Sequence, residues 1–72
     1  MKKQFVLEYL DCAHCAQKIE DAVRKLPEVD DVQVNFLKQT LTLTAADEDF
    51  DRTVKLVAKT CRRVEPDCRM KV

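Results

Sequence analysis

Two helical patterns, each placed between alternating segments, constrain the fold of this 72-residue chain more than any other feature. Apolar residues recur at helical spacing from Cys15 to Leu26 and again from Phe50 to Cys61. In four short segments apolar and polar residues instead alternate, which is the pattern of half-buried strands. These segments cover residues 5–9, 32–36, 40–44 and 64–72. The sequence therefore predicts two helices and four strands in the order βαββαβ.

This order predicts an α+β, ferredoxin-like sandwich, in which a four-stranded antiparallel sheet carries both helices on one face. We expect residues 1–72 to form a single domain. Right-handed crossovers place the first and third strands at the centre of the sheet and the fourth beside the first. Cys61 is then expected near Cys12 and Cys15. An extended segment from Cys61 to Cys68 would separate the two by roughly 20 Å, which excludes a disulfide between them and leaves Cys68 in the core.

Size and charge exclude several classes of function. Thirteen basic and thirteen acidic residues cancel without forming long blocks, so nothing predicts binding to nucleic acid or to an anionic membrane. No apolar run approaches the roughly 18 residues of a membrane span, and the first residues do not form a signal peptide. We therefore expect a cytosolic chain without membrane insertion, whose four cysteines stay reduced. A domain this small favours binding or carrying over catalysis.

The most informative motif is the pair of cysteines between the first alternating segment and the first helical pattern, Cys12 and Cys15. Two thiols about one turn apart at a helix start can hold one soft metal ion, because the first amides and the helix dipole favour thiolates. Asp11 adds a carboxylate, which suits Zn(II) or Cd(II) better than Cu(I). The sequence therefore predicts a metal site at Asp11, Cys12 and Cys15, too distant for Cys68 to share.

Other roles for these residues stay open. Asp11 would also suit the start of the helix as a capping residue or as a first-turn charge. His14 is predicted to face solvent, although imidazole is a metal ligand. A CxxC between a strand and a helix is also the redox motif of thioredoxin-like oxidoreductases. Those folds end with a helix and place a proline opposite the cysteines, and neither Pro27 nor Pro66 stands where it would face them.

Three stretches of the sequence stand in the order and place of a known family. They are Leu10-Asp11-Cys12-Ala13-His14-Cys15-Ala16, Gln17-Lys18-Ile19-Glu20 and Val32-Gln33-Val34-Asn35-Phe36. With them the chain resembles a heavy-metal-associated domain, the ferredoxin-like module of soft-metal P-type ATPases and small metallochaperones. Copper-handling members carry a Gly-Met pair where this chain has Tyr9-Leu10. An aspartate directly before the first cysteine resembles the zinc, cadmium and lead exporters.

The resemblance implies a metal-binding domain of a cadmium, zinc or lead efflux P-type ATPase, which delivers Zn(II), Cd(II) or Pb(II) to the transporter or regulates it. The implied partners are the transmembrane and cytosolic domains of that ATPase, at the cytoplasmic side of the cell membrane. The chain itself is then no enzyme and mostly a monomer, although an ion bridging two copies would give a dimer. The alternative is a free-standing Cu(I) metallochaperone or a copper-ATPase domain, which has the same fold.

Cys61 departs from the family pattern. In the loop after the second helix the family usually has a glycine and an aromatic residue or a lysine, where this chain reads Thr60-Cys61-Arg62-Arg63. An extra thiol there predicts a third sulfur ligand beside Cys12 and Cys15, a set that favours cadmium or lead. Cys61 would alternatively continue the apolar stripe of the second helix as a small buried residue.

Overall fold

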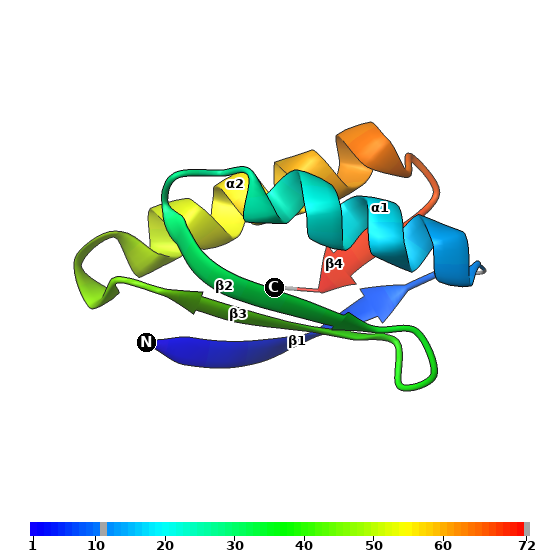
Figure 1. Cartoon of the computed structure of the whole chain (residues 1–72), viewed down its shortest axis with the longest axis horizontal. Coiled ribbons are helices and arrows are strands. Elements are labelled where there is room, and N and C mark those ends of the chain that lie inside the picture. The colour runs from blue at the N-terminus through cyan, green and yellow to red at the C-terminus, as the bar shows by residue number, and fades with distance from the viewer. Residues whose placement is uncertain (11, 72) are drawn as a thin grey trace.

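The computed structural model describes residues 1–10 and 12–71, which form two layers (Figure 1). In chain order the elements are β1 (Lys2–Glu8), α1 (Ala13–Arg24), β2 (Val29–Asn35), β3 (Thr40–Ala45), a 3₁₀ turn (Asp47–Asp49), α2 (Phe50–Val64) and β4 (Arg69–Lys71). Neighbouring strands are antiparallel and lie in the order β2-β3-β1-β4. Both helices cover one face of the sheet (Figure 1). The predicted ferredoxin-like sandwich is therefore confirmed, with β1 and β3 at its centre.

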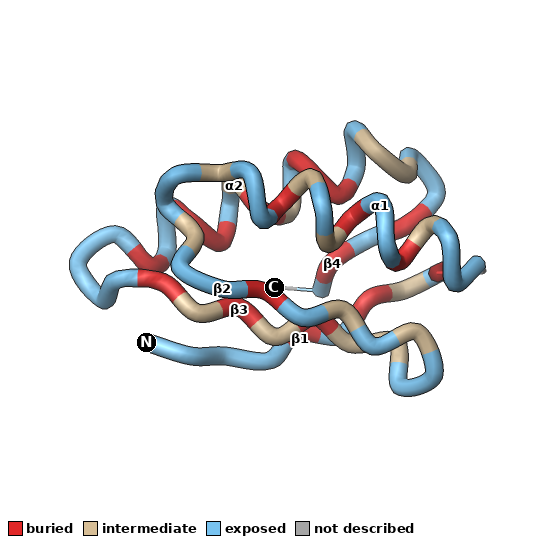
Figure 2. Tube along the Cα trace, viewed as in Figure 1, coloured by how far each residue is buried: buried red, intermediate tan, exposed pale blue. Residues whose placement is uncertain are grey.

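The core lies between the sheet and the helices, where the buried segments of each element face one another (Figure 2). Leu41 and Leu43 of β3, Ile19 and Val23 of α1 and Val57 of α2 are fully buried members of one apolar cluster. Burial of one such side chain stabilises the fold by roughly 1.5–3 kcal/mol. The cluster therefore fixes both helices on the sheet. No helix within the described ranges is long and apolar enough to cross a membrane.

The second helix continues further than its apolar pattern predicts. The buried hydroxyl of Thr60 donates a hydrogen bond of 2.8 Å to a carbonyl of the preceding turn, so this polar group costs little inside the core. Arg62 and Arg63 occupy the last turn, where positive charge interacts favourably with the helix dipole. α2 therefore passes Cys61 and ends at Val64.

The fourth strand is shorter than predicted. The prediction that the segment from Cys61 to Cys68 is extended is wrong. β4 begins only at Arg69, and Pro66 lies in the turn before it. In that turn the backbone N–H of Cys68 donates to the carbonyl oxygen of Glu65 at 3.0 Å. The turn brings Cys68 back toward Cys61, near enough for a negative charge on the Cys68 sulfur to raise the pKa of the Cys61 thiol. Neither cysteine forms a disulfide and both side chains are fully buried, which confirms the expected place of Cys68 in the core.

Candidate metal site

The N-terminus of α1 positions the two cysteines of the CxxC motif. Cys12 is the N-cap residue, with an extended backbone (φ −145°, ψ 132°), and its carbonyl accepts a hydrogen bond of 3.1 Å from the N–H of Ala16. Cys15 lies in the first turn of the helix. Cys12 is exposed, Cys15 is half-buried, and His14 between them is exposed as predicted. The motif therefore presents two sulfur atoms at one accessible end of the molecule.

The backbone amides at the helix start favour the thiolate of Cys12. The N–H of Cys15 and then that of His14 lower the pKa of the Cys12 thiol, since a thiolate accepts hydrogen bonds from them. The Cys15 thiol adds to this effect as a donor, while the carboxylate of Glu65 opposes it weakly. Cys12 is therefore the more readily ionised of the two sulfurs and is suited to make the first bond to a soft cation.

Cys15 has the opposite electrostatic environment. Its thiol donates a hydrogen bond to the carboxylate of Glu65, and this contact, together with partial desolvation and the neighbouring Cys12 sulfur, raises the pKa of Cys15 to about 12. The free site therefore holds one sulfur as a proton donor and one as an acceptor. A bound cation would replace the proton on Cys15.

A small cavity lies next to Cys15, between the segment that follows β1 (Tyr9 and Leu10) and the turn that follows α2. Its volume is about 30 Å³, and Cys15, Glu65, Asp67 and Cys68 contribute to its walls. Cys68 thus lines the same small cavity as Cys15. The described residues contain no metal-holding group that includes it, so its exclusion from the metal site stays a prediction. Burial of the Cys68 side chain separates it from solvent, whereas Glu65 is only half-buried.

Gln39, in the turn between β2 and β3, holds Leu10 in the segment that leads from β1 to the CxxC motif. The side-chain amide of Gln39 accepts a hydrogen bond from the N–H of Leu10 at 3.3 Å and donates to the carbonyl oxygen of the same residue. Its backbone carbonyl accepts a further bond of 2.7 Å from Leu7. Tyr9 and Gln39 both adopt positive φ, 63° and 55°, which an L-residue adopts only at a local cost. The loop is therefore held from outside the helix that carries the cysteines.

Among the described residues, the structure does not bring Cys61 together with Cys12 and Cys15 as a metal-holding group. Asp11 lies outside the described residues. Cys61 is fully buried, and burial, followed by the charge of Cys68, raises the pKa of its thiol to about 12. Among residues 1–10 and 12–71 no group of three or more His, Cys, Asp or Glu side chains is arranged to hold a metal ion. Cys12 and Cys15 are thus the accessible sulfurs, and Cys61 lies within the apolar stripe of α2.

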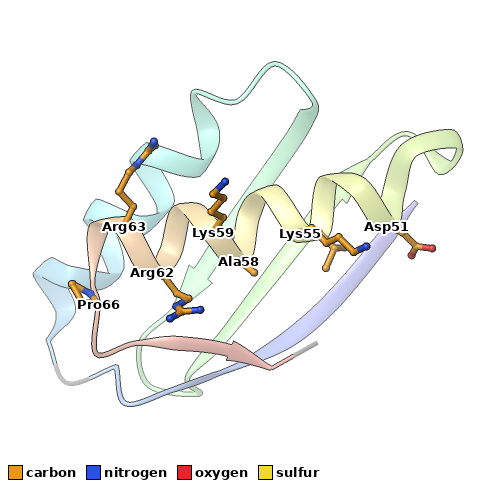
Figure 3. Close-up of a pocket in the computed structure, with 8 residues that line it drawn as sticks. Asp51, Lys55, Ala58, Lys59, Arg62, Arg63 and Pro66 are labelled. Carbon is orange, nitrogen blue, oxygen red and sulfur yellow. The ribbon is translucent and has the colours of Figure 1, made fainter.

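A larger groove runs along α2 (Figure 3). Its lining consists of Asp51, Val54, Lys55, Ala58, Lys59, Arg62, Arg63 and Pro66. Four of these eight side chains are positively charged, one is a carboxylate, and none is a thiol. Cationic side chains repel a metal ion, so this groove does not compete with the cysteine pair as a metal site.

Two residues near the site were not predicted from the sequence. The sequence pattern predicts Glu65 in the fourth strand, because it ends the second helix too early, and it predicts for Gln39 only a place in a turn. The sequence does carry a signal for the place of Glu65. Basic residues such as Arg62 and Arg63 are typical of the last turn of a helix, which would place Glu65 directly after α2. No sequence signal indicates that the amide of Gln39 reaches Leu10, 29 residues away.

Comparison with known proteins identifies the family. The model of the heavy-metal-associated domain matches residues 5–61, most of the chain. The chain belongs to the heavy-metal-associated domain family. It is thus a metal-binding domain, and the cysteine pair at the start of α1 falls inside the matched region. The thioredoxin-like alternative is not supported by this fold or this family.

The relatives of this heavy-metal-associated domain include metal-transporting ATPases. The chain is 33% identical over 66 residues, 92% of its length, to a cadmium, zinc and cobalt-transporting ATPase of Bacillus subtilis. Over 46 residues, 64% of the chain, it is 46% identical to a zinc/cadmium/lead-transporting P-type ATPase of Escherichia coli. These matches span only 9% and 6% of the two relatives. The predicted resemblance to the zinc, cadmium and lead ATPases is confirmed.

Solved structures share the fold of the domain. The N-terminal domain of ZntA in its Zn(II) form superposes with a TM-score of 0.74 and 27% identity, over 97% of this chain and 88% of that one. The N-terminal domain of PacS from Synechocystis PCC6803 superposes with a TM-score of 0.78 and 26% identity, over 100% and 96% of the two chains. PacS is described as a copper(I) ATPase. Fold likeness therefore extends to domains that handle different metals.

Proposed function

We propose that this heavy-metal-associated domain serves a divalent-metal efflux P-type ATPase and binds Zn(II) or Cd(II), with Pb(II) in the same class, through Cys12 and Cys15. The observation that carries the proposal is the placement of both sulfurs at the exposed start of α1, with the pKa of Cys12 lowered by helix amides. Thiolate sulfur is a preferred ligand of these soft or borderline cations.

Capture and exchange of the ion follow from the two thiol environments. Cys12, favoured as a thiolate, makes the first bond, and Cys15 makes the second when the ion displaces its proton. Binding therefore releases protons, and the metal affinity falls as the pH falls. The accessible position of the pair allows ligands of another site to replace the two sulfurs one at a time. This suits a domain that passes its ion on or senses its level.

The remaining predicted ligands belong to the same proposal. Asp11 would add a carboxylate oxygen beside the pair, a donor that favours a divalent ion. Ligation by Cys61 stays a prediction, and it would require this fully buried side chain to leave the core. The proposed partners are the transmembrane and cytosolic domains of the parent ATPase, at the cytoplasmic side of the cell membrane. The two relatives support this assignment, because each is a transporting ATPase of these metals.

Copper(I) is the second candidate ion. The likeness to the PacS domain favours it, and two thiolates alone can satisfy Cu(I). The divalent assignment is preferred because the ATPase relatives handle zinc and cadmium and because Asp11 adds an oxygen donor.

A competitive titration of the reduced chain with Zn(II), Cd(II), Pb(II) and Cu(I), followed by thiolate-to-metal absorption, tests the proposal. We expect tight divalent binding that the Cys12→Ser/Cys15→Ser variant loses. Cys61→Ser tests the third predicted sulfur, because a drop in Cd(II) or Pb(II) affinity in this variant would indicate a three-sulfur site. Unchanged Zn(II) and Cd(II) affinity in the double variant would refute the site, and binding confined to Cu(I) would transfer the assignment to a copper domain.

A further inference from the structure

Tyr9 leads the chain out of β1 toward the CxxC motif in a conformation that an L-residue avoids. Its φ of 63° lies in the left-handed region, where the β-carbon comes too close to the following carbonyl oxygen. The side chain of Tyr9 is 69% exposed, so burial of the ring does not offset the cost of this conformation. Contacts of the neighbouring backbone are therefore needed to hold the turn.

The next residue, Leu10, is held by a polar clamp from the turn between β2 and β3. The side-chain oxygen of Gln39 accepts a hydrogen bond from the N–H of Leu10 at 3.3 Å, and its nitrogen donates to the carbonyl oxygen of Leu10. The same nitrogen also donates to the carbonyl oxygen of Phe36 at 3.3 Å, within the turn. The amide therefore uses its acceptor and both of its donors, which fixes its orientation.

The turn that carries the clamp is itself anchored to β1. The N–H of Leu7 donates to the carbonyl oxygen of Gln39 at 2.7 Å, and the N–H of Gln39 donates to that of Phe36 at 3.3 Å. Leu7 and Leu10 both belong to the buried apolar cluster. Figure 1 shows this turn at the same end of the molecule as the start of α1. A distant part of the chain therefore fixes the backbone two residues before Cys12.

Loss of the clamp would act on one sulfur more than on the other. Tyr9 would be free to relax to negative φ, which changes the direction of the chain that leads to Cys12. Cys15 is fixed separately, inside the first turn of α1. The two sulfurs would then be aligned for one ion in only a fraction of the molecules. The apparent affinity of a site falls by the same factor as the fraction of molecules that are competent to bind.

We propose that Gln39 is a positioning residue of the metal site, which holds the strained turn at Tyr9 and thereby keeps Cys12 aligned with Cys15. In this role Gln39 binds no ion and acts through the backbone of Leu10. The inference rests on the proposed function and adds to it a residue, from another part of the fold, that sets the affinity. It implies a coupling between positions 9 and 39, because glycine at position 9 adopts positive φ without strain and would no longer need the clamp.

A double-mutant cycle between these two positions tests the proposal in the reduced full chain. We expect Gln39→Met to weaken Zn(II) binding by about tenfold, a size typical of lost supporting contacts at metal sites, but only about threefold in the Tyr9→Gly background. Tyr9→Ala is the matched control, because it removes the ring and keeps the β-carbon, so the tenfold loss should persist in it. Equal losses in the Tyr9→Gly and Tyr9→Ala backgrounds would overturn the proposal.

A second variant separates the clamp from the turn that carries it. Gln39→Asn keeps an amide and suits the φ of 55° at this position, but its side chain is one methylene shorter and falls short of Leu10. We expect a loss of Zn(II) affinity comparable to that of Gln39→Met, in variants that circular dichroism shows to be folded. Thiolate-to-Cd(II) absorption should keep its wild-type wavelength, because the ligands are unchanged, and a shifted wavelength would contradict a positioning role.

The outcome for Gln39 is distinguishable from the outcome for the proposed function. If Zn(II) binding requires Cys12 and Cys15 but both Gln39 variants keep wild-type affinity, the inference about Gln39 fails while the proposed function stands.

Discussion

The two pairs of cysteines in this domain lie at different depths of the same fold. The outer pair, Cys12 and Cys15, is accessible at the start of α1, whereas the inner pair, Cys61 and Cys68, is fully buried between α2 and β4. Helix amides lower the pKa of Cys12, and burial raises that of Cys61 to about 12. The comparison teaches that a thiol becomes a candidate ligand through its surroundings, since all four residues are chemically the same.

A carboxylate introduced into each pair in turn should show the largest difference between them. Cys61→Asp buries a carboxylate among apolar side chains, and we expect a loss of about 4 kcal/mol or more in the free energy of unfolding, enough to unfold much of a domain this small. Cys12→Asp is exposed at a helix N-cap, where aspartate is favoured, and we expect almost no loss. Urea denaturation followed by circular dichroism measures both. Similar losses in the two variants would show that the depths do not differ.

Alkaline pH probes the inner pair without changing its shape. The pKa of Cys61 is raised from 9.0 to about 12, so the unfolded chain loses this proton at lower pH than the folded chain. The contribution to stability is fully present below pH 9 and is lost as the pH rises from 9 to 12. At pH 11 the loss attributable to Cys61 is about 2–3 kcal/mol by this linkage.

Cys61→Ala isolates this contribution from that of other titrating groups. Urea midpoints of the reduced wild type and the variant are compared at pH 7 and pH 11. We expect the variant to lose less stability over this interval than the wild type. An equal alkaline loss in both chains would contradict the assignment of the shift to Cys61 and point to the remaining titrating groups.

Sequence patterns predicted the order of the elements because each one has a clear period and a buried face. The apolar stripe of α2 did not reveal where the helix ends, since the satisfied hydroxyl of Thr60 and the charges of Arg62 and Arg63 extend it beyond Cys61. That error placed Glu65 in a strand and separated two cysteines that lie together. The outer pair was predictable because its spacing is local. The contact between Cys15 and Glu65 depends on tertiary packing that no local spacing encodes.

The position of the outer pair depends on a polar clamp, the two hydrogen bonds between the Gln39 side-chain amide and the backbone of Leu10. The position of the inner pair depends on apolar packing. Gln39→Met keeps the length of the side chain but removes the amide that bonds the buried Leu10 at both its N–H and its carbonyl. Two backbone groups then lose their partners, and we expect a cost of roughly 1–2 kcal/mol. Gln33→Met, on the exposed side of β2, is the matched control and should cost little. Urea midpoints compare the two, and equal values would show that the clamp does not hold the loop.

Thiol reactivity sharpens the difference within the outer pair, where the expected effect is smallest. With iodoacetamide near pH 8, Cys12 should be modified about ten times faster than Cys15, because thiolate is the reacting form and only Cys12 has a lowered pKa. Glu65→Gln removes the largest cause of the raised pKa of Cys15, so the gap between the two rates should narrow. Cys61 should react only after unfolding. Mass spectrometry of timed digests gives all these rates, and faster modification of Cys15 than of Cys12 in the wild type would reverse the order in which the two sulfurs are proposed to take up the ion.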